Sequence, residues 1–250
     1  MKVTERLRTT LKKIVNFSLL NAVMEKGRIY LLIMCTFLSA PMAGQTYLKP
    51  FYSSKTPETI ELLRIETSPQ STTLYLSVEN RIAGGYFCTD RRTYLYLPDK
   101  TRLRLTKASG IPYCPELHKF LSVGEKLQYE LVFPPLPEKT KWVDVVEECG
   151  ANCYAIYGIV LDNELNNRLE RLFSEAAVKT PGENITLFSQ FLKENTNPGV
   201  DGLLYVNIIN AAVDAGNKVE AAVWYKRLVS SDVPRRDVYI RLLNDKGIKF

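Results

Sequence analysis

Apolar and polar residues alternate along several short stretches between residues 59 and 161. The alternation is clearest over 72–79 and recurs over 127–133. A period of two residues is typical of a half-buried β-strand. About seven or eight short strands with turn residues between them predict an antiparallel β-sandwich. The remaining strands are expected at 59–67, 86–88, 93–97, 102–106, 142–146 and 154–161.

The pattern changes to a helical one after Asp162. Apolar residues then recur at spacings of three and four, which is typical of amphipathic helices packed on one face. The chain is therefore predicted to be an α+β protein of two domains, a β-sandwich over 45–162 and an all-α domain over 163–250. Helices are expected near 163–178, 187–197, 203–215, 219–229 and 237–243.

Three short motifs carry a resemblance to a known module. They are Leu-Val-Phe-Pro-Pro-Leu-Pro at 131–137, Asp-Val-Val-Glu at 144–147 and Tyr-Gly-Ile at 157–159. Together with Gly-Ile-Pro at 110–112, they resemble a small immunoglobulin-like β-sandwich module of secreted Bacteroidetes-type proteins. The resemblance covers roughly 58–162 and implies a module without catalytic residues. In some relatives this module precedes a thioredoxin-like domain, but the helical part here has no thioredoxin motif.

Residues 203–229 resemble one hairpin of a tetratricopeptide repeat. Two residues depart from the repeat pattern, because Ile209 stands where a glycine is expected and Ala212 where an aromatic residue is expected. A stable solenoid needs about three repeats, so a plain helical bundle is the alternative. The residues that match the repeat are Tyr205, Ile208, Gly216, Ala221, Tyr225 and Pro234.

The first 44 residues read as a secretory signal peptide with a long basic region. An apolar run over 29–40 follows Lys26 and Arg28, and it is too short for a membrane-spanning helix. Met24 would be a more usual start, and an amphipathic helix over 5–24 is the alternative reading. The leader predicts export to the periplasm, cell surface or extracellular space, with membrane contact only through the leader itself.

The positive charge of the protein is concentrated in this leader. Residues 1–43 contain seven Lys/Arg and two Glu, which accounts for five of the six net positive charges. The body lacks the basic surface that nucleic-acid binding requires, so we expect no nucleic-acid partner.

Export changes what the cysteines are expected to do. Four of the five cysteines lie beyond the leader, and an even number in an oxidising compartment predicts two disulfides. Three pairings are possible, of which Cys88–Cys114 with Cys149–Cys153 is favoured because it closes one long and one short loop.

Two other kinds of chemistry involve the same cysteines. Cys149 and Cys153 could form a thiol–disulfide redox pair, although three residues separate them instead of two and strands flank them. Alternatively, Cys114, His118, Cys149 and Cys153 could bind zinc, since each pair has a spacing of four.

The usual signatures of an active site are missing from the sequence. There is one histidine, no G-x-S-x-G, no P-loop and no G-x-G-x-x-G. We therefore expect a non-enzymatic protein without a cofactor, which binds a protein or peptide through its helical domain. Trp224, Tyr225 and Arg227 are the candidate binding residues, because these types are enriched at interface hot spots. The oligomeric state is not predicted.

Overall fold

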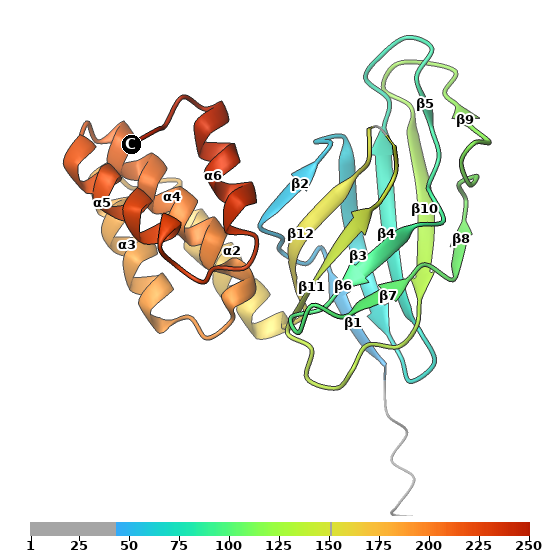
Figure 1. Cartoon of the computed structure of the whole chain (residues 1–250), viewed down its shortest axis with the longest axis horizontal. Coiled ribbons are helices and arrows are strands. Elements are labelled where there is room, and N and C mark those ends of the chain that lie inside the picture. Colours follow the sequence, from blue (N-terminus) through green and yellow to red (C-terminus); the bar gives the residue numbers. More distant parts are fainter. Residues whose placement is uncertain (1–43, 151) are drawn as a thin grey trace, which may run out of the picture. The chain divides into compact units, whose positions relative to one another are not determined.

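The structure is a computed structural model that describes residues 44–150 and 152–250 (Figure 1). Residues Gly44–Phe250 form one compact unit, so contacts cross the expected domain boundary after residue 162. The predicted signal peptide, the alternative start at Met24 and Cys35 lie outside the described residues. The part of the chain that is described has antiparallel sheets followed by five α-helices, which confirms the α+β prediction.

Ten of the strands form two five-stranded antiparallel sheets. Across the first sheet the order is β1 (Gln45–Leu48), β3 (Ile60–Thr67), β4 (Thr72–Glu79), β10 (Lys126–Phe133) and β8 (Lys107–Ser109). Across the second sheet the order is β2 (Ser54–Thr56), β12 (Ala155–Val160), β11 (Trp142–Glu147), β6 (Thr93–Tyr96) and β7 (Arg102–Arg104). A separate pair joins β5 (Tyr86–Phe87) to β9 (His118–Lys119).

Side chains from both sheets meet in one hydrophobic cluster. Leu74 of β4 and Leu131 of β10 come from the first sheet, while Val143 of β11 and Ile156 of β12 come from the second. All four are fully buried, because alternate residues of each strand point to the same side of its sheet. In the first sheet, β4 and β10 therefore follow the alternation that predicted them.

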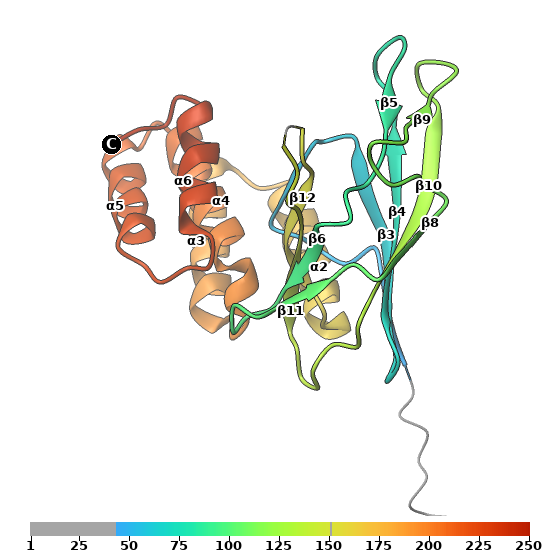
Figure 2. The ribbon, with the colours of Figure 1, turned by 45° about the vertical axis from the view of Figure 1, so that its right-hand side comes forward.

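The helices follow directly after the second sheet. They are α2 (Asn163–Ala176), α3 (Pro181–Glu194), α4 (Asp201–Asp214), α5 (Lys218–Val229) and α6 (Arg236–Asp245), and a short 3₁₀ turn, η1 (Pro198–Val200), precedes α4. Figure 2 shows the same helices from a second direction. None of the helices among the described residues is both long and apolar enough to span a bilayer.

Polar side chains fix where these helices begin. Asp162 accepts a hydrogen bond from the Leu165 N–H at the start of α2, and Asn217 does the same for Glu220 at the start of α5. Thr180 and Glu183 form a capping box at the start of α3, with Pro181 at its first position. Such caps satisfy N–H groups that have no partner inside the helix.

Candidate functional site

A buried ion pair joins the β-region to the helices. Arg235, which precedes α6, pairs with Asp144 of β11, and their side chains are 11% and 8% exposed. Asp144 also accepts a hydrogen bond of 2.7 Å from the Gly158 N–H. The Arg235 guanidinium lies 4.4 Å from the ring centre of Trp142. Burial raises the pKa of Asp144, and Arg235 opposes that rise.

Close backbone approach completes this junction. The Ser53 hydroxyl donates a 2.7 Å hydrogen bond to the Gly199 carbonyl, which links the chain before β2 to the 3₁₀ turn. A Cβ atom on Gly199 would lie 2.4 Å from Cγ of Trp142, so only glycine fits there. The junction therefore positions the helices on the second sheet through specific contacts.

The helices present a groove between α2 and α3. Its volume is about 290 Å³, and it is open to solvent. The two helices run antiparallel, since the Asn184 side chain near the start of α3 donates to the Ala176 carbonyl at the end of α2. The lining residues are Arg168, Arg171, Leu172 and Glu175 from α2, and Leu187, Gln190, Phe191 and Glu194 from α3.

The groove combines an apolar floor with charged sides. Leu172 is buried, while Leu187 and Phe191 are half-buried. The Arg168 guanidinium lies 5.0 Å from the Phe191 ring centre, which is a cation–π distance. Arg171 lies one helical turn further along α2 and is exposed. This arrangement can hold an apolar side chain on its floor and an acidic group beside Arg171.

The three residues predicted to bind a partner lie together on α5. Trp224 is half-buried, packs edge-to-face on Tyr205 of α4 and has the Arg227 guanidinium 4.5 Å from its ring centre. The Tyr225 hydroxyl donates to Asn244 of α6 at 3.3 Å. Packing between helices thus already uses Trp224 and Tyr225, whereas Arg227 is exposed.

Both disulfides of the favoured pairing are present. The cysteines of the Cys88–Cys114 bond are 26 residues apart in the sequence, and those of the Cys149–Cys153 bond are 4 residues apart. The short loop joins β11 to β12, so its cysteines lie between strands and not at a helix N-terminus. The Cys149 N–H donates to Sγ of Cys153 at 3.1 Å.

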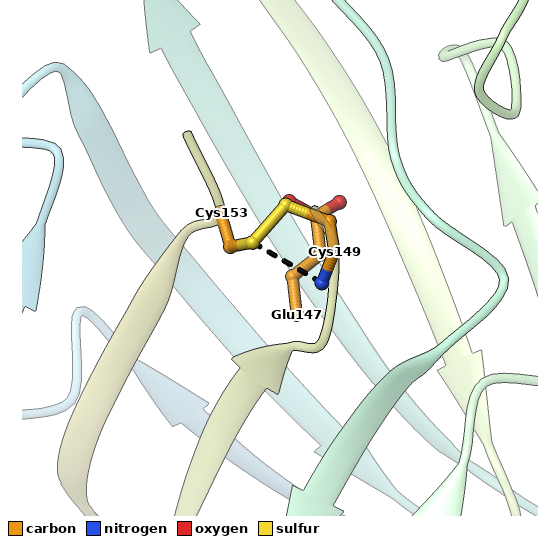
Figure 3. Close-up of side chains that lie close together, drawn as sticks. All are labelled: Glu147, Cys149 and Cys153. Carbon is orange, nitrogen blue, oxygen red and sulfur yellow. Dashed lines mark hydrogen bonds between the residues drawn. A yellow bond between two sulfur atoms is a disulfide. The ribbon is translucent and has the colours of Figure 1, made fainter. Parts of the chain in front are cut away.

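A buried carboxylate lies beside the short disulfide (Figure 3). Glu147, the last residue of β11, is 6% exposed. Its carboxylate accepts hydrogen bonds from the Asp90 N–H at 2.7 Å and the Tyr154 N–H at 3.3 Å. Burial raises the pKa of Glu147, and these hydrogen bonds partly offset the rise. Because Asp90 follows Cys88 by two residues, Glu147 connects the surroundings of the two disulfides.

The structure does not assemble the four residues of the alternative zinc site. The Cys114 sulfur is bonded to Cys88, and the sulfurs of Cys149 and Cys153 are bonded to each other. His118 is instead 3.8 Å from a carboxylate oxygen of Glu125. Within the described residues, potential metal-ligand atoms gather at Glu147, Cys149 and Cys153, where they lie within 4.8 Å of one another. This group offers thiolates only after reduction.

The Glu147 carboxyl should give the stability of the protein a distinct pH dependence. Its folded-state pKa is above the unfolded value, so the folded protein binds this proton more tightly. The corresponding stabilisation is present below the unfolded-state pKa and is lost as pH rises through the folded-state pKa. We expect Glu147→Gln to remove this loss, so that the variant gains stability relative to wild type as pH rises above the ordinary glutamate pKa of about 4.3.

Urea unfolding at several pH values measures this difference. Glu148→Gln is the matched control, because Glu148 is the next carboxylate in the chain but its side chain is 38% exposed and pairs with Arg102. If the free energies of unfolding of Glu147→Gln and wild type differ by the same amount at every pH, the expected role of Glu147 is contradicted.

The sequence pattern singled out the cysteines but not the groove or the junction. Helical spacing predicts that Leu172, Leu187 and Phe191 face a neighbouring helix, yet it does not show that a gap between α2 and α3 leaves Leu187 and Phe191 half-buried. Comparison with protein-family models, with curated proteins and with solved structures gives no match. The function must therefore be argued from the geometry of this chain alone.

Proposed function

We propose that the chain is an exported, non-enzymatic interaction module that binds a peptide segment of another protein in the groove between α2 and α3. The observation that carries this proposal is the groove itself, with its apolar floor and the exposed Arg171 at its side. Two disulfides support export, because such bonds persist in oxidising compartments.

The finer fold belongs to the same proposal. Two five-stranded sheets that share one core support an immunoglobulin-like sandwich as the rigid base. In the hairpin of α4 and α5, Gly216 adopts a φ of 72° and Ala221 is fully buried. A left-handed glycine between the helices and a small residue at their contact support a tetratricopeptide-like hairpin.

The chemistry of the groove defines the ligand that we expect. Leu172, Leu187 and Phe191 favour an aliphatic or aromatic anchor. Full burial of such a side chain is worth about 1.5–3 kcal/mol, and an open groove supplies part of that. Arg171 favours an acidic residue close to that anchor, whereas the Glu175 carboxylate one turn further along α2 already pairs with Lys179 at 3.3 Å. A short peptide with an apolar anchor and a neighbouring acidic residue would match the groove.

Selection from a random peptide library displayed on phage tests this proposal with the disulfide-intact chain as bait. Selected peptides are expected to carry an apolar anchor and an acidic residue. Arg171→Glu should weaken their binding about tenfold, measured by fluorescence anisotropy. Arg227→Glu is the matched control, because it places the same charge change on exposed α5 and should leave affinity unchanged.

Three results would contradict the groove as the binding site. They are the absence of selected peptides, affinity that is insensitive to Arg171→Glu, and loss of affinity in Arg227→Glu. The last result would move the binding face to α5, where Trp224, Tyr225 and Arg227 lie, and would keep the interaction function.

The alternative function is thiol–disulfide exchange at Cys149 and Cys153. The observation that favours it is the carboxylate of Glu147, one oxygen of which lies within 4.8 Å of both sulfurs. The position between β11 and β12 disfavours it, because neither cysteine lies at the N-terminus of a described helix, where the helix dipole would lower a thiol pKa. An ionised Glu147 would also raise the pKa of a neighbouring thiol.

A further inference from the structure

Two loops at one end of the β-region expose large apolar side chains. One loop spans 80–85 between β4 and β5, and the other spans 120–125 between β9 and β10. Figures 1 and 2 both show them projecting side by side beyond the neighbouring strands. Leu121 is 94% exposed, Ile82 67% and Val123 60%. We call the following exposed residues the apolar tip: Ile82, Leu121 and Val123 from the loops, and Tyr86 at the start of β5.

Hydrogen bonds between the loops hold the tip in place. Asn80 is buried and connects to the second loop through three bonds, to the Ser122 carbonyl at 2.7 Å, to the Glu125 carbonyl at 2.8 Å and from the Gly124 N–H at 2.8 Å. On the other side of the tip, β5 pairs with β9, and Cys88–Cys114 closes the chain around this pair. The tip is therefore a preformed surface.

The fold itself does not use the apolar tip. Phe120 turns inward and is buried in the core of the β-region, whereas the next residue, Leu121, points into solvent. Isolated exposed apolar residues are ordinary, but three on adjacent loops with an exposed tyrosine next to them mark an interaction surface. Because the two loops project beyond the neighbouring strands, they can enter a soft medium ahead of the rest of the β-region.

The charges around the tip fit the interface of a lipid bilayer. Arg81 and Lys126 both lie near Glu79, at 3.9 and 3.5 Å, and their side chains are 60% and 54% exposed. Long basic side chains can reach lipid phosphates while their stems contact apolar material. Glu125 accepts hydrogen bonds from the Leu121 and Ser122 N–H groups, so its charge is engaged at the base of the loop.

We propose that the apolar tip inserts into the interfacial layer of a lipid bilayer. Aliphatic side chains at the loop ends would reach the acyl boundary, and Tyr86 would lie at headgroup level, where tyrosine is enriched. The opposite charges of the exposed Glu116 and Lys119 nearly cancel. Apolar contact, and not net charge, therefore supplies most of the attraction between the tip and the bilayer. Binding of this kind is weak and reversible, and it is independent of the groove between α2 and α3.

Tryptophan scanning of the full, disulfide-bonded chain tests the insertion. Leu121→Trp places an indole at the tip, and Val178→Trp places one at a residue that is 87% exposed beyond α2. Vesicles of phosphatidylcholine and phosphatidylglycerol with brominated acyl chains quench only indoles that reach the acyl region. We expect the fluorescence that Leu121→Trp adds over wild type to fall about twofold, and that of Val178→Trp to stay unchanged.

A second set of variants separates the tip from any membrane contact of the leader. Ile82→Ser and Val123→Ser, introduced together into Leu121→Trp, should restore most of the quenched fluorescence, because the neighbouring anchors are lost. Equal quenching in Leu121→Trp and Val178→Trp would overturn the proposal, since it would mean immersion of the whole chain. If brominated lipid does not quench the fluorescence of Leu121→Trp, the proposal is also overturned. If the wild-type chain is then a dimer and Leu121→Ser is a monomer, the tip binds a second copy of the chain.

Discussion

Replacement of Arg235 by methionine is expected to lower the free energy of unfolding by about 3–5 kcal/mol. The substitution keeps most of the aliphatic stem but removes the cation that pairs with Asp144, whose side chain is only 8% exposed. A carboxylate left in that position would have the Gly158 N–H as its remaining hydrogen-bond donor in the junction. The loss is large because an unpaired buried charge costs more than the pair contributes.

A double-mutant cycle distinguishes this cause from simple loss of packing. Asp144→Asn keeps an oxygen for the Gly158 N–H and removes the charge, so combining it with Arg235→Met should recover a large part of the lost stability. Urea unfolding of the disulfide-intact chain measures all four corners of the cycle. Arg241→Met is the matched control on exposed α6, with an expected change within about 0.5 kcal/mol. Strict additivity of the two single substitutions would contradict the ion pair as the cause.

The regular elements were predictable because one period dominates each of them. β4 spans Thr72–Glu79 as the alternation predicts, since Leu74, Leu76 and Val78 face the core while Thr73 and Tyr75 do not. The five helices begin and end within a few residues of their predicted ranges, with the largest difference at α3. There, the sequence places the start near residue 187, whereas Thr180, Pro181 and Gly182 already form the cap and first turn of α3.

The strand count was predicted less well. Sequence periodicity indicates seven or eight strands, whereas the described residues contain twelve. The additional strands are β1, which has four residues, and β2, β8 and β9, which have two or three residues each. An alternating pattern cannot be recognised over so few positions, because it needs about four residues. Their pairing depends on partners elsewhere in the sheet.

Contacts between distant residues explain why the candidate sites were not predictable. Asp144 and Arg235 are separated by 91 residues, and no local pattern marks Arg235 as the partner of a β-strand carboxylate. The groove likewise depends on how closely α2 and α3 pack. The tip residues read as ordinary loop or strand positions, and only their exposure shows that the core leaves them outside. By contrast, loop lengths alone favoured the disulfide pairing that the structure contains.

The two disulfides should differ in what their removal costs. Cross-links restrict the unfolded chain more strongly when they close longer loops. From the separations of 26 and 4 residues, Cys88→Ala with Cys114→Ala should lower the free energy of unfolding by about 3.5 kcal/mol, and Cys149→Ala with Cys153→Ala by about 2 kcal/mol. Urea unfolding of each double variant against wild type measures both values without a reductant.

The same variants also separate a structural disulfide loop from a redox pair. If Cys149–Cys153 only braces the loop between β11 and β12, Glu147 has no part in proton transfer. A dithiol should then reduce this disulfide no faster in wild type than in Glu147→Gln. Reduction that is much slower in Glu147→Gln, together with a stability loss well below about 2 kcal/mol for the Cys149–Cys153 double variant, would favour exchange chemistry. A loss near the chain-entropy value would instead assign this disulfide to bracing the loop, as the interaction-module proposal requires.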